Sequence, residues 1–570
     1  MYNNTKLIQK KRLAMTYPYD NLENFTLKSL IDRSVALFPN KPALAKVGQD
    51  PMSYDELRQT IQETIIMLHD NGIKKGDKVA ILSENMPNWG VAYLSITYFG
   101  AVAVPILPDF HTSDIHHIIH HSEAKAIFVS HKHLSTIEEL NDSKLHFVIK
   151  LDDLKMVNPL TNHSYISKTK QNIRLDKELS VPAEDDMAAL LYTSGTTGNS
   201  KGVMLSHKNL TTNALSTYSK IEIHPSDVFL SILPLAHTLE CTVGFLVPIL
   251  HGASVVYIDK VPTPSVLLKA FGVVKPTMMV SVPLIIEKIY KNKVLPKLTD
   301  SFIMRTLYKI PFFRKKLNKI AGKKLIDTFG GRLRFFGIGG AGISPYVENF
   351  LKEAEFPYII GYGLTETAPL LAGTVLGSNV KLKSTGTVFP YVEVKVKDPD
   401  DETGSGELLF KSPSLMMGYY KDEKLSAEVI DNDGWFHSGD LGYVDEDGYI
   451  FINGRSKNVI IGSGGENIFP EQIEATINQN EAVLESLVMM KGDRLIAKIH
   501  LDYELIDKRF ETHSLPDCEV KAKINDLLED IRQDVNTQVA AYAKILKFIE
   551  QIEPFIKTPT KKIKRFLYVE

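Results

Sequence analysis

Short apolar runs alternate with longer helical stretches between Phe25 and Pro283, and few folds are compatible with this pattern. The runs KVAILS (78–83), AIFVS (126–130) and ASVVYI (253–258) are rich in aliphatic and β-branched residues, while YDELRQTIQETIIMLHDNG (54–72) has its apolar residues at helical spacing. Strands that are apolar throughout and separated by helices are typical of parallel sheets covered on both faces. The pattern predicts an α/β fold.

The character of the chain changes after Thr387. The segments VEVKVKDPDDETGSGELLFKS (392–412) and DEDGYIFING (445–454) combine short strands with tight turns, which indicates a β-rich subdomain. A small final unit follows, with helical runs expected from Val520 to Ile549. We therefore predict a large N-terminal domain of parallel-rich α/β sheets plus a β-rich subdomain over residues 1–455, and a small C-terminal α+β domain over residues 456–570.

Composition excludes several classes of protein. The 570 residues contain 66 basic and 68 acidic side chains, so nothing favours nucleic-acid binding by the chain as a whole. Two cysteines, Cys241 and Cys518, are too few for a disulfide framework, which favours a cytoplasmic location. The N-terminus lacks the apolar core of a signal peptide, and no stretch of about 18 uncharged apolar residues occurs, so no transmembrane segment is expected.

The run TSGTTGNSKG (193–202) concentrates hydroxyl groups and glycines before a single cation, Lys201. Backbone N–H groups, hydroxyl donors and an ammonium group are what a nucleotide polyphosphate can use. The Walker A pattern does not fit, because Ser200 stands where its second glycine should be. The buried run before it and Ser206, a candidate helix N-cap after it, favour a phosphate loop over a flexible surface loop.

Two further glycine-rich segments have the chemistry of a nucleotide site. GIGGAGIS (337–344) follows an apolar run, where glycine lets the backbone approach a flat ligand, although a plain turn explains it equally. In GYGLTET (361–367), Tyr362 can stack on a base, Thr365 can donate to a phosphate and Glu366 can hold Mg²⁺. A β-turn with a packed tyrosine is the alternative.

Later segments contribute a carboxylate, a histidine and lysines. In GWFHSGDLGYVDEDGYIFINGR (434–455), Asp440 can accept hydrogen bonds from ribose hydroxyls, and the acidic residues 445–447 indicate a hairpin turn and not a calcium loop. His237 in LPLAHTLE is, taken alone, a candidate core histidine. KTPTKKIKRF (557–566) is, taken alone, a solvated tail. HHIIHHSE (116–123) has histidines at zinc-binding spacing but lacks the glutamate of a metalloprotease motif.

The order of these motifs is more specific than any one of them. The chain contains YTSGTTGNSKG, LPLAH, GGA, GYGLTET, HSGD, GRSKNVI and TPTKKIKR in this order. In this it resembles the adenylate-forming enzymes, the superfamily of acyl-CoA synthetases, amino-acid-activating domains and luciferases, and the resemblance covers nearly all of the chain. It implies an enzyme that uses ATP and Mg²⁺, with the small C-terminal domain rotating between two half-reactions.

The resemblance also implies a role for individual residues. Glu366 would hold Mg²⁺, Thr365 would touch the α-phosphate, His237 would lie beside the substrate carboxylate, and Lys562 would bind that carboxylate and the α-phosphate. The nucleotide would be held by the phosphate loop Thr193, Ser194, Gly195, Thr196, Thr197, Gly198 and Lys201, the adenine slot Gly340, Ala341 and Tyr362, and the ribose partners Asp440 and Arg455, with Lys457 as the hinge. In two places the chain departs from the family pattern: SKN stands at the hinge, and Lys561 replaces the usual glycine before the catalytic lysine, which leaves Lys561 as an alternative to Lys562.

The substrate is expected to be a long-chain fatty acid. SVPLIIEKIYKNKV (281–294), together with an insert of some forty residues before GGRLRFF, resembles the long-chain acyl-CoA synthetases, and the apolar region 245–286 can wall an alkyl tunnel or form ordinary core. The acceptor would be coenzyme A or acyl carrier protein. An aryl or short-chain acid ligase and a non-catalytic nucleotide-binding protein are the alternatives. The basic insert 291–324 predicts either peripheral contact with the inner face of a membrane or a solvated hairpin.

Overall fold

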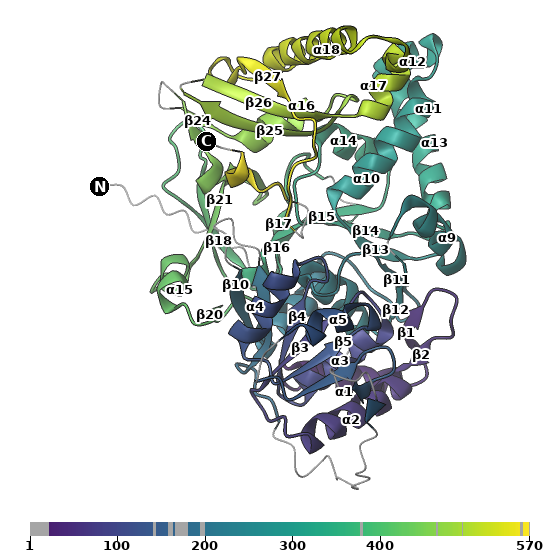
Figure 1. Ribbon diagram of the computed structural model, residues 1–570, viewed down its shortest axis with the longest axis vertical. Helices are drawn as coiled ribbons and strands as arrows, with labels where there is room; N and C mark the ends of the chain where they lie inside the picture. Colours follow the sequence, from purple (N-terminus) through teal and green to yellow (C-terminus); the bar gives the residue numbers. More distant parts are fainter. Residues whose placement is uncertain are drawn as a thin grey trace.

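The computed structural model describes residues 22–568 except 141–143, 158–163, 166–180, 194–199, 261, 377–379, 463–465, 493 and 559–561. Within these residues the chain forms two nine-stranded sheets, a four-stranded sheet and a three-stranded sheet, besides the short pair β23 (Ile460–Ile461) and β24 (Asn467–Ile468) (Figure 1). Helices cover the large sheets, so the predicted α/β class is confirmed.

The first large sheet is parallel at its centre, where β9, β4, β3, β5 and β6 run side by side, and antiparallel at both ends. The predicted strands at 78–83 and 126–130 lie here. In spatial order its strands are β20 (Gly418–Tyr419), β10 (Lys201–Ser206), β9 (Met187–Thr193), β4 (Val102–Ile106), β3 (Lys78–Leu82), β5 (Ala126–Val129), β6 (Phe147–Lys150), β7 (Lys155–Val157) and β8 (Ser164–Tyr165).

The second large sheet has six parallel strands from β1 to β15 and antiparallel strands at its edges. The predicted strand at 253–258 is β12 in this sheet. In spatial order its strands are β17 (Thr387–Val388), β16 (Leu370–Gly373), β15 (Tyr358–Gly363), β14 (Phe335–Ile338), β13 (Met278–Ser281), β11 (Val228–Ser231), β12 (Ser254–Tyr257), β1 (Pro42–Lys46) and β2 (Met52–Ser53).

One helix is buried between these two sheets. α3 (Pro87–Tyr98) contacts β3 and β4 of the first sheet and β1 of the second, and nearly all its side chains are inaccessible to solvent. Trp89 stacks on Tyr93, and both meet the ring of Phe245 edge-on. A helix that is apolar all round has no solvent face, which is why this segment lies in the interior. Phe245 belongs to the same core, so this end of the region 245–286 is packed interior.

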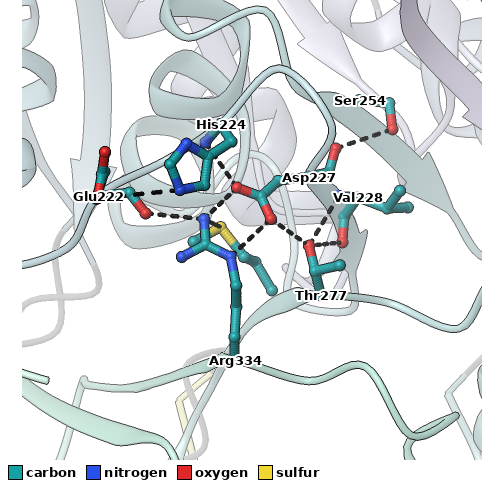
Figure 2. A network of polar contacts seen from close by, with 8 residues as sticks. Glu222, His224, Asp227, Val228, Ser254, Thr277 and Arg334 are labelled. Carbon is teal, nitrogen blue, oxygen red and sulfur yellow. Dashed lines mark hydrogen bonds and ion pairs between the residues drawn. The ribbon is translucent and has the colours of Figure 1, made fainter. Parts of the chain in front are cut away.

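A carboxylate ties together the amino ends of the parallel strands in the second sheet (Figure 2). Asp227, just before β11, is buried and accepts hydrogen bonds from the Nε of Arg334 at 2.8 Å, from the Oγ1 of Thr277 at 2.8 Å and from the backbone N of His224 at 2.7 Å. Arg334 and Thr277 directly precede β14 and β13. One side chain therefore connects three strands at the edge opposite their carboxyl ends.

The β-rich region predicted after Thr387 is a four-stranded antiparallel sheet. Its strands are β18 (Glu393–Lys397), β19 (Gly406–Lys411), β21 (Phe436–Val444) and β22 (Ile450–Arg455). The acidic residues between β21 and β22 form the hairpin turn that we predicted, and Lys381 bridges Asp445 and Asp447 at 2.5 Å each. Among the described residues, no cluster of His, Cys, Asp or Glu has the geometry of a metal site.

The end of the chain packs around its own hydrophobic cluster, which includes Ile473, Val488, Ile499 and Leu528. The three-stranded sheet β25 (Val483–Lys491), β26 (Arg494–Leu501) and β27 (Lys547–Glu550) is covered by α16 (Pro470–Ile477) and α18 (Asp517–Gln538). The expectation of helix from Val520 to Ile549 was wrong at its end, because β27 pairs in parallel with β26. Long-range strand pairing overrides the local preference there.

Helices fill the insert between β13 and β14. α10 (Pro283–Ile289) leads through the turn Tyr290–Val294 into α11 (Leu295–Thr299), α12 (Phe302–Lys309) and α13 (Pro311–Thr328). α13 packs on α14 (Pro345–Glu353), whereas α12 buries none of its residues. In the described part of the chain, no helix is both long and apolar enough to cross a bilayer.

Candidate active site

Residues from three separate segments meet at the carboxyl end of β15. Tyr362, in β15, donates a hydrogen bond from its hydroxyl to the Oδ2 of Asp440 at 2.6 Å, and the Nε of Arg455 lies 2.7 Å from the Oδ1 of the same carboxylate. Asp440 and Arg455 face each other across the β21–β22 pairing. The residues expected at adenine and at ribose are therefore adjacent, although the sequence separates them by up to ninety-odd positions.

Burial affects this carboxylate strongly. Desolvation raises the pKa of Asp440, although the charge of Arg455, the hydroxyl of Tyr362 and the charge of Lys562 act in the opposite direction. A buried carboxylate that keeps hydrogen-bond donors on both oxygens is held in one orientation. Asp440 is thus a fixed acceptor at the edge of the site.

Glu366 lies in the short 3₁₀ turn Thr365–Thr367 that follows β15. Its Oε1 accepts a hydrogen bond from the hydroxyl of Tyr419 at 2.9 Å, and its backbone carbonyl accepts from the N of Met416 at 2.8 Å. The Nζ of Lys201 lies 5.5 Å from the centre of the Tyr419 ring. Tyr419 therefore connects the expected magnesium ligand to the lysine of the phosphate loop, a role that our reading of the sequence missed.

The phosphate loop connects two antiparallel strands. Thr193 ends β9 and pairs with Lys201 at the start of β10, while Ser194, Gly195, Thr196, Thr197 and Gly198 lie outside the described residues. Ser206 caps α7 (His207–Ser216), as predicted, by accepting from the N of Asn209 at 3.1 Å. One strand, β10, therefore separates the loop from the helix.

Lys562 reaches this site from the far end of the chain. In Figure 1 the yellow C-terminal segment runs from β27 down toward β15 and β17. Part of the residue is accessible to solvent, but the protein around its ammonium group excludes much of the water. This desolvation and the charge of Arg455 lower the pKa of Lys562, whereas the charges of Asp440 and Glu366 act in the opposite direction. Lys562 therefore lies among the same charged groups. Lys561 is outside the described residues.

His237 lies within the range of the charge of Lys562. Burial, assisted by the charge of Lys562, lowers the pKa of His237 to about 4. The imidazole is therefore neutral at pH 7, and its Nδ1 accepts a hydrogen bond from the N of Leu239 at 3.3 Å. With Nδ1 as acceptor, the proton sits on Nε2, which is left as a donor.

Two predicted positions lie at the margins of the site. Gly340 and Ala341 form an exposed turn after β14, beside β15, and Gly340 has a φ of +85°, a conformation that side chains rarely adopt. Lys457 is exposed in a 3₁₀ turn directly after β22.

The histidines at 116–123 are engaged elsewhere: His116 bonds to the carbonyl of Thr136 at 2.7 Å, and His121 to the hydroxyl of Tyr192 at 2.8 Å.

This arrangement fits a nucleotide with its metal ion. The site has three cationic side chains that can donate hydrogen bonds, those of Lys201, Arg455 and Lys562. Asp440 supplies an acceptor. Among described residues, the bond from Tyr419 occupies only Oε1 of Glu366, so Oε2 can serve as a hard oxygen ligand for Mg²⁺. An exposed glycine turn beside Tyr362 suits a flat base.

The family model described as AMP-binding enzyme matches residues 31–420. The chain belongs to this family. The resemblance to adenylate-forming enzymes that the motifs indicated is thereby confirmed. The match includes the phosphate loop, His237, the turn at 339–341 and Glu366, whereas Asp440, Arg455 and Lys562 lie beyond it.

Curated relatives of this AMP-binding enzyme include long chain acyl-CoA synthetase 7, peroxisomal, of Arabidopsis thaliana, which is 28% identical over 560 residues, with 90% of this chain and 79% of that protein covered. Fatty acyl-CoA synthetase A of Dictyostelium discoideum is 26% identical, with 87% and 80% covered.

Solved structures show the same fold at lower identity. ATP-bound MatB from Rhodopseudomonas palustris has a TM-score of 0.73 at 23% identity, with 95% of this chain and 98% of that chain covered. The anthranilate CoA ligase AuaEII in complex with anthranoyl-AMP has a TM-score of 0.76 at 21% identity, with 96% and 97% covered.

Proposed function

We propose that this AMP-binding enzyme activates a long-chain fatty acid with ATP, forming acyl-AMP and releasing pyrophosphate, and then transfers the acyl group to the thiol of coenzyme A, which releases AMP. The observation behind the proposal is the position of Lys562, which lies among Glu366, Asp440 and Arg455 and beside neutral His237. These groups come from distant parts of the chain and have no evident structural purpose together.

The first step brings a carboxylate to a polyphosphate, and both are anions. In the proposal, Lys201 and Lys562 offset this repulsion and the charge that grows on the α-phosphate. Glu366 would hold Mg²⁺, which would supply further positive charge for the phosphates. Asp440 and Arg455 orient the ribose, and Tyr362 contacts the base. Neutral His237 can donate from Nε2 to the acid without adding charge. Thr365 directly precedes Glu366, where its hydroxyl can reach the α-phosphate.

Substrate class and acceptor rest on the relatives and on the insert. The acyl-CoA synthetases named above act on long-chain or fatty acids, and the helical insert α11–α13 stands where the sequence resembled that branch. Acyl carrier protein offers the same thiol chemistry and is the second candidate acceptor. We further propose residues 1–455 and 456–570 as the two moving parts, with Lys457 at the hinge.

Pyrophosphate exchange tests the first half of this proposal. We expect ATP and Mg²⁺ to support exchange with long-chain fatty acids and much less with aryl or short acids, followed by thioester formation on adding coenzyme A. Thioester formation only with phosphopantetheinylated acyl carrier protein would change the acceptor. Exchange that is absent with every acid, while ATP still binds, would identify a non-catalytic nucleotide-binding protein.

We also propose that the insert contacts the inner face of a membrane. Apolar side chains on α12 and the start of α13 are strongly exposed, with Phe302 at 78%, Ile303 at 70% and Phe312 at 61%. The same insert carries exposed cations: Lys293, Lys297, Arg305, Lys309, Lys315, Lys316, Lys323 and Lys324. Exposed apolar groups with a cationic surround match an anionic lipid surface, where fatty acids also partition. The expected location is therefore cytoplasmic and peripheral.

Three basic residues of the segment 291–324 fall outside this surface. Arg314 pairs with Glu353 at 2.8 Å and Lys319 with Glu355 at 2.7 Å. Lys291 is half-buried against another part of the chain. The proposed membrane surface is therefore limited to the exposed residues of α12 and α13 and the lysines beside them.

A further inference from the structure

Lys291 contacts a part of the chain that is far away in the sequence. It lies in the turn Tyr290–Val294 at the start of the insert, and its Nζ donates to the backbone carbonyl of Asn480 at 3.2 Å and to that of Val483 at 3.0 Å. These acceptors stand 189 and 192 positions later in the chain. The contact therefore joins the insert to the C-terminal part of the chain.

The acceptors belong to a well-built turn between α16 and β25. The N of Val483 donates to the carbonyl of Asn480 at 3.1 Å, and the N of Ala482 donates to the Asn480 side chain at 2.9 Å. Ala482 and Val483 are buried in the C-terminal hydrophobic cluster. Lys291 is therefore attached to a fixed part of that unit and not to a loose loop.

The charges around Lys291 come from both sides of this contact. The negative charges of Asp502 and Glu481 in the C-terminal unit, and of Glu287 in the adjoining helix α10, act on its ammonium group. Two carbonyl oxygens accept hydrogen bonds from the ammonium group, and the three carboxylates favour its charged form. Lys288, three positions earlier, is exposed.

The contact lies beyond the end of α16 that is farther from the proposed hinge. The start of α16 touches β22 near the proposed hinge, where Gln472 bonds to Asn453 at 3.2 Å. Its eight residues then extend for about 12 Å, at roughly 1.5 Å per residue, toward the turn held by Lys291. A rotation about residue 457 moves this far end more than the near end. The contact with Lys291 therefore exists in only one orientation of the unit.

That orientation is the one in which Lys562 lies in the site. We infer that Lys291 is a positioning residue, which holds the C-terminal unit in the pose for acyl-AMP formation and must release it before thioester formation. The inference rests on the proposed function. It predicts that loss of Lys291 affects the two half-reactions differently, although Lys291 is not placed in the catalytic machinery.

The test compares Lys291→Met with the matched control Lys288→Met, which also replaces a lysine by an uncharged chain of similar length. We expect Lys291→Met to slow pyrophosphate exchange by at least roughly tenfold, the scale of one hydrogen bond to a charged donor, while thioester formation from supplied acyl-AMP proceeds at the normal rate or faster. Lys288→Met should change neither. Lys291→Arg, which keeps the charge and the donors, should recover most of the exchange rate.

A distance measurement tests the pose without catalysis. Cys518 is exposed and Cys241 is buried, so a dye pair can occupy Cys518 and a cysteine placed at exposed Glu402. We expect a broader distance distribution in Lys291→Met than in the parent protein or in Lys288→Met. An unchanged distribution, or equal slowing of both half-reactions, would overturn the inference. If the parent protein shows no exchange with any acid, the proposed function fails, whereas the distance result still reports on Lys291.

Discussion

Asp227 is the residue whose contribution to stability is clearest. It is buried, and desolvation alone would raise its pKa, but hydrogen bonds from Arg334, the N of His224 and Thr277 outweigh this and lower the pKa below the usual range (Figure 2). A carboxyl group with a lowered pKa in the folded state stabilises the fold at any pH above its unfolded pKa of about 3.9, and this contribution is lost as the pH falls through the folded pKa.

We expect Asp227→Asn to lower the free energy of unfolding by about 3 kcal/mol at pH 7, because it leaves the guanidinium of Arg334 without its charged partner. The loss should shrink as the pH falls below the unfolded pKa of about 3.9, and should disappear only below the lowered folded pKa, where the carboxylate of the folded parent protein is protonated as well. Urea unfolding at several pH values measures this. Asp185→Asn is the control, since that side chain is 87% exposed. A deficit that stays constant with pH would show that charge is not its cause.

At the scale of elements, the pair α12 and α13 departs from the pattern of an ordinary surface. α12 buries none of its residues, although it contains Phe302, Ile303 and Leu307, and the ring of Phe312 lies 4.5 Å from the Nζ of Lys316. Such a helix gains little from burial against its own chain. Its apolar side chains are available to a partner, which we propose is an anionic lipid surface.

We expect the double variant Phe302→Ser, Phe312→Ser to bind vesicles of anionic lipid at least roughly tenfold more weakly than the parent, since each aromatic ring contributes about 1.5–3 kcal/mol when fully buried. Flotation with anionic and neutral vesicles measures this. Ile461→Ser, at another site that is 61% exposed, should leave binding unchanged. Equal flotation of the parent with both kinds of vesicle would indicate a solvated hairpin.

For the whole molecule, the decisive feature is that one site is built from both ends of the chain. Lys562 enters from a C-terminal unit with its own hydrophobic cluster, whereas Glu366 and Asp440 stand on the sheets of the larger part. In our proposal this unit rotates as a body, so that a single residue takes part in one half-reaction and is absent from the other.

We expect Lys562→Ala to slow acyl-AMP formation by roughly 10²- to 10³-fold, the usual effect of removing one group that stabilises transition-state charge, and to leave thioester formation from supplied acyl-AMP near the parent rate. Pyrophosphate exchange and thioester assays measure the two steps. Lys564→Ala is the control. The same split in Lys561→Ala, with Lys562→Ala normal, would move the role by one position. Equal loss of both steps would contradict the rotation.

Local chemistry was sufficient for the features that depend on neighbours in the chain. Ser206 as a helix cap, the hairpin turn at Asp445–Gly448 and the alternation of strands and helices all follow from residues within a few positions of each other. The order of the motifs indicated the family in the same way. Local preference failed at Lys547–Glu550, where pairing with β26 decides the conformation.

By itself, then, the sequence determined the α/β class, the family and the residue types of the site. Only the tertiary structure decided which of them meet: Tyr419 on Glu366, Lys562 beside His237 and Arg455, and Lys291 on the turn at Asn480. These contacts join residues that are 53 to several hundred positions apart. Their formation depends on how the sheets and the C-terminal unit pack against each other, and no property of a local segment encodes that packing.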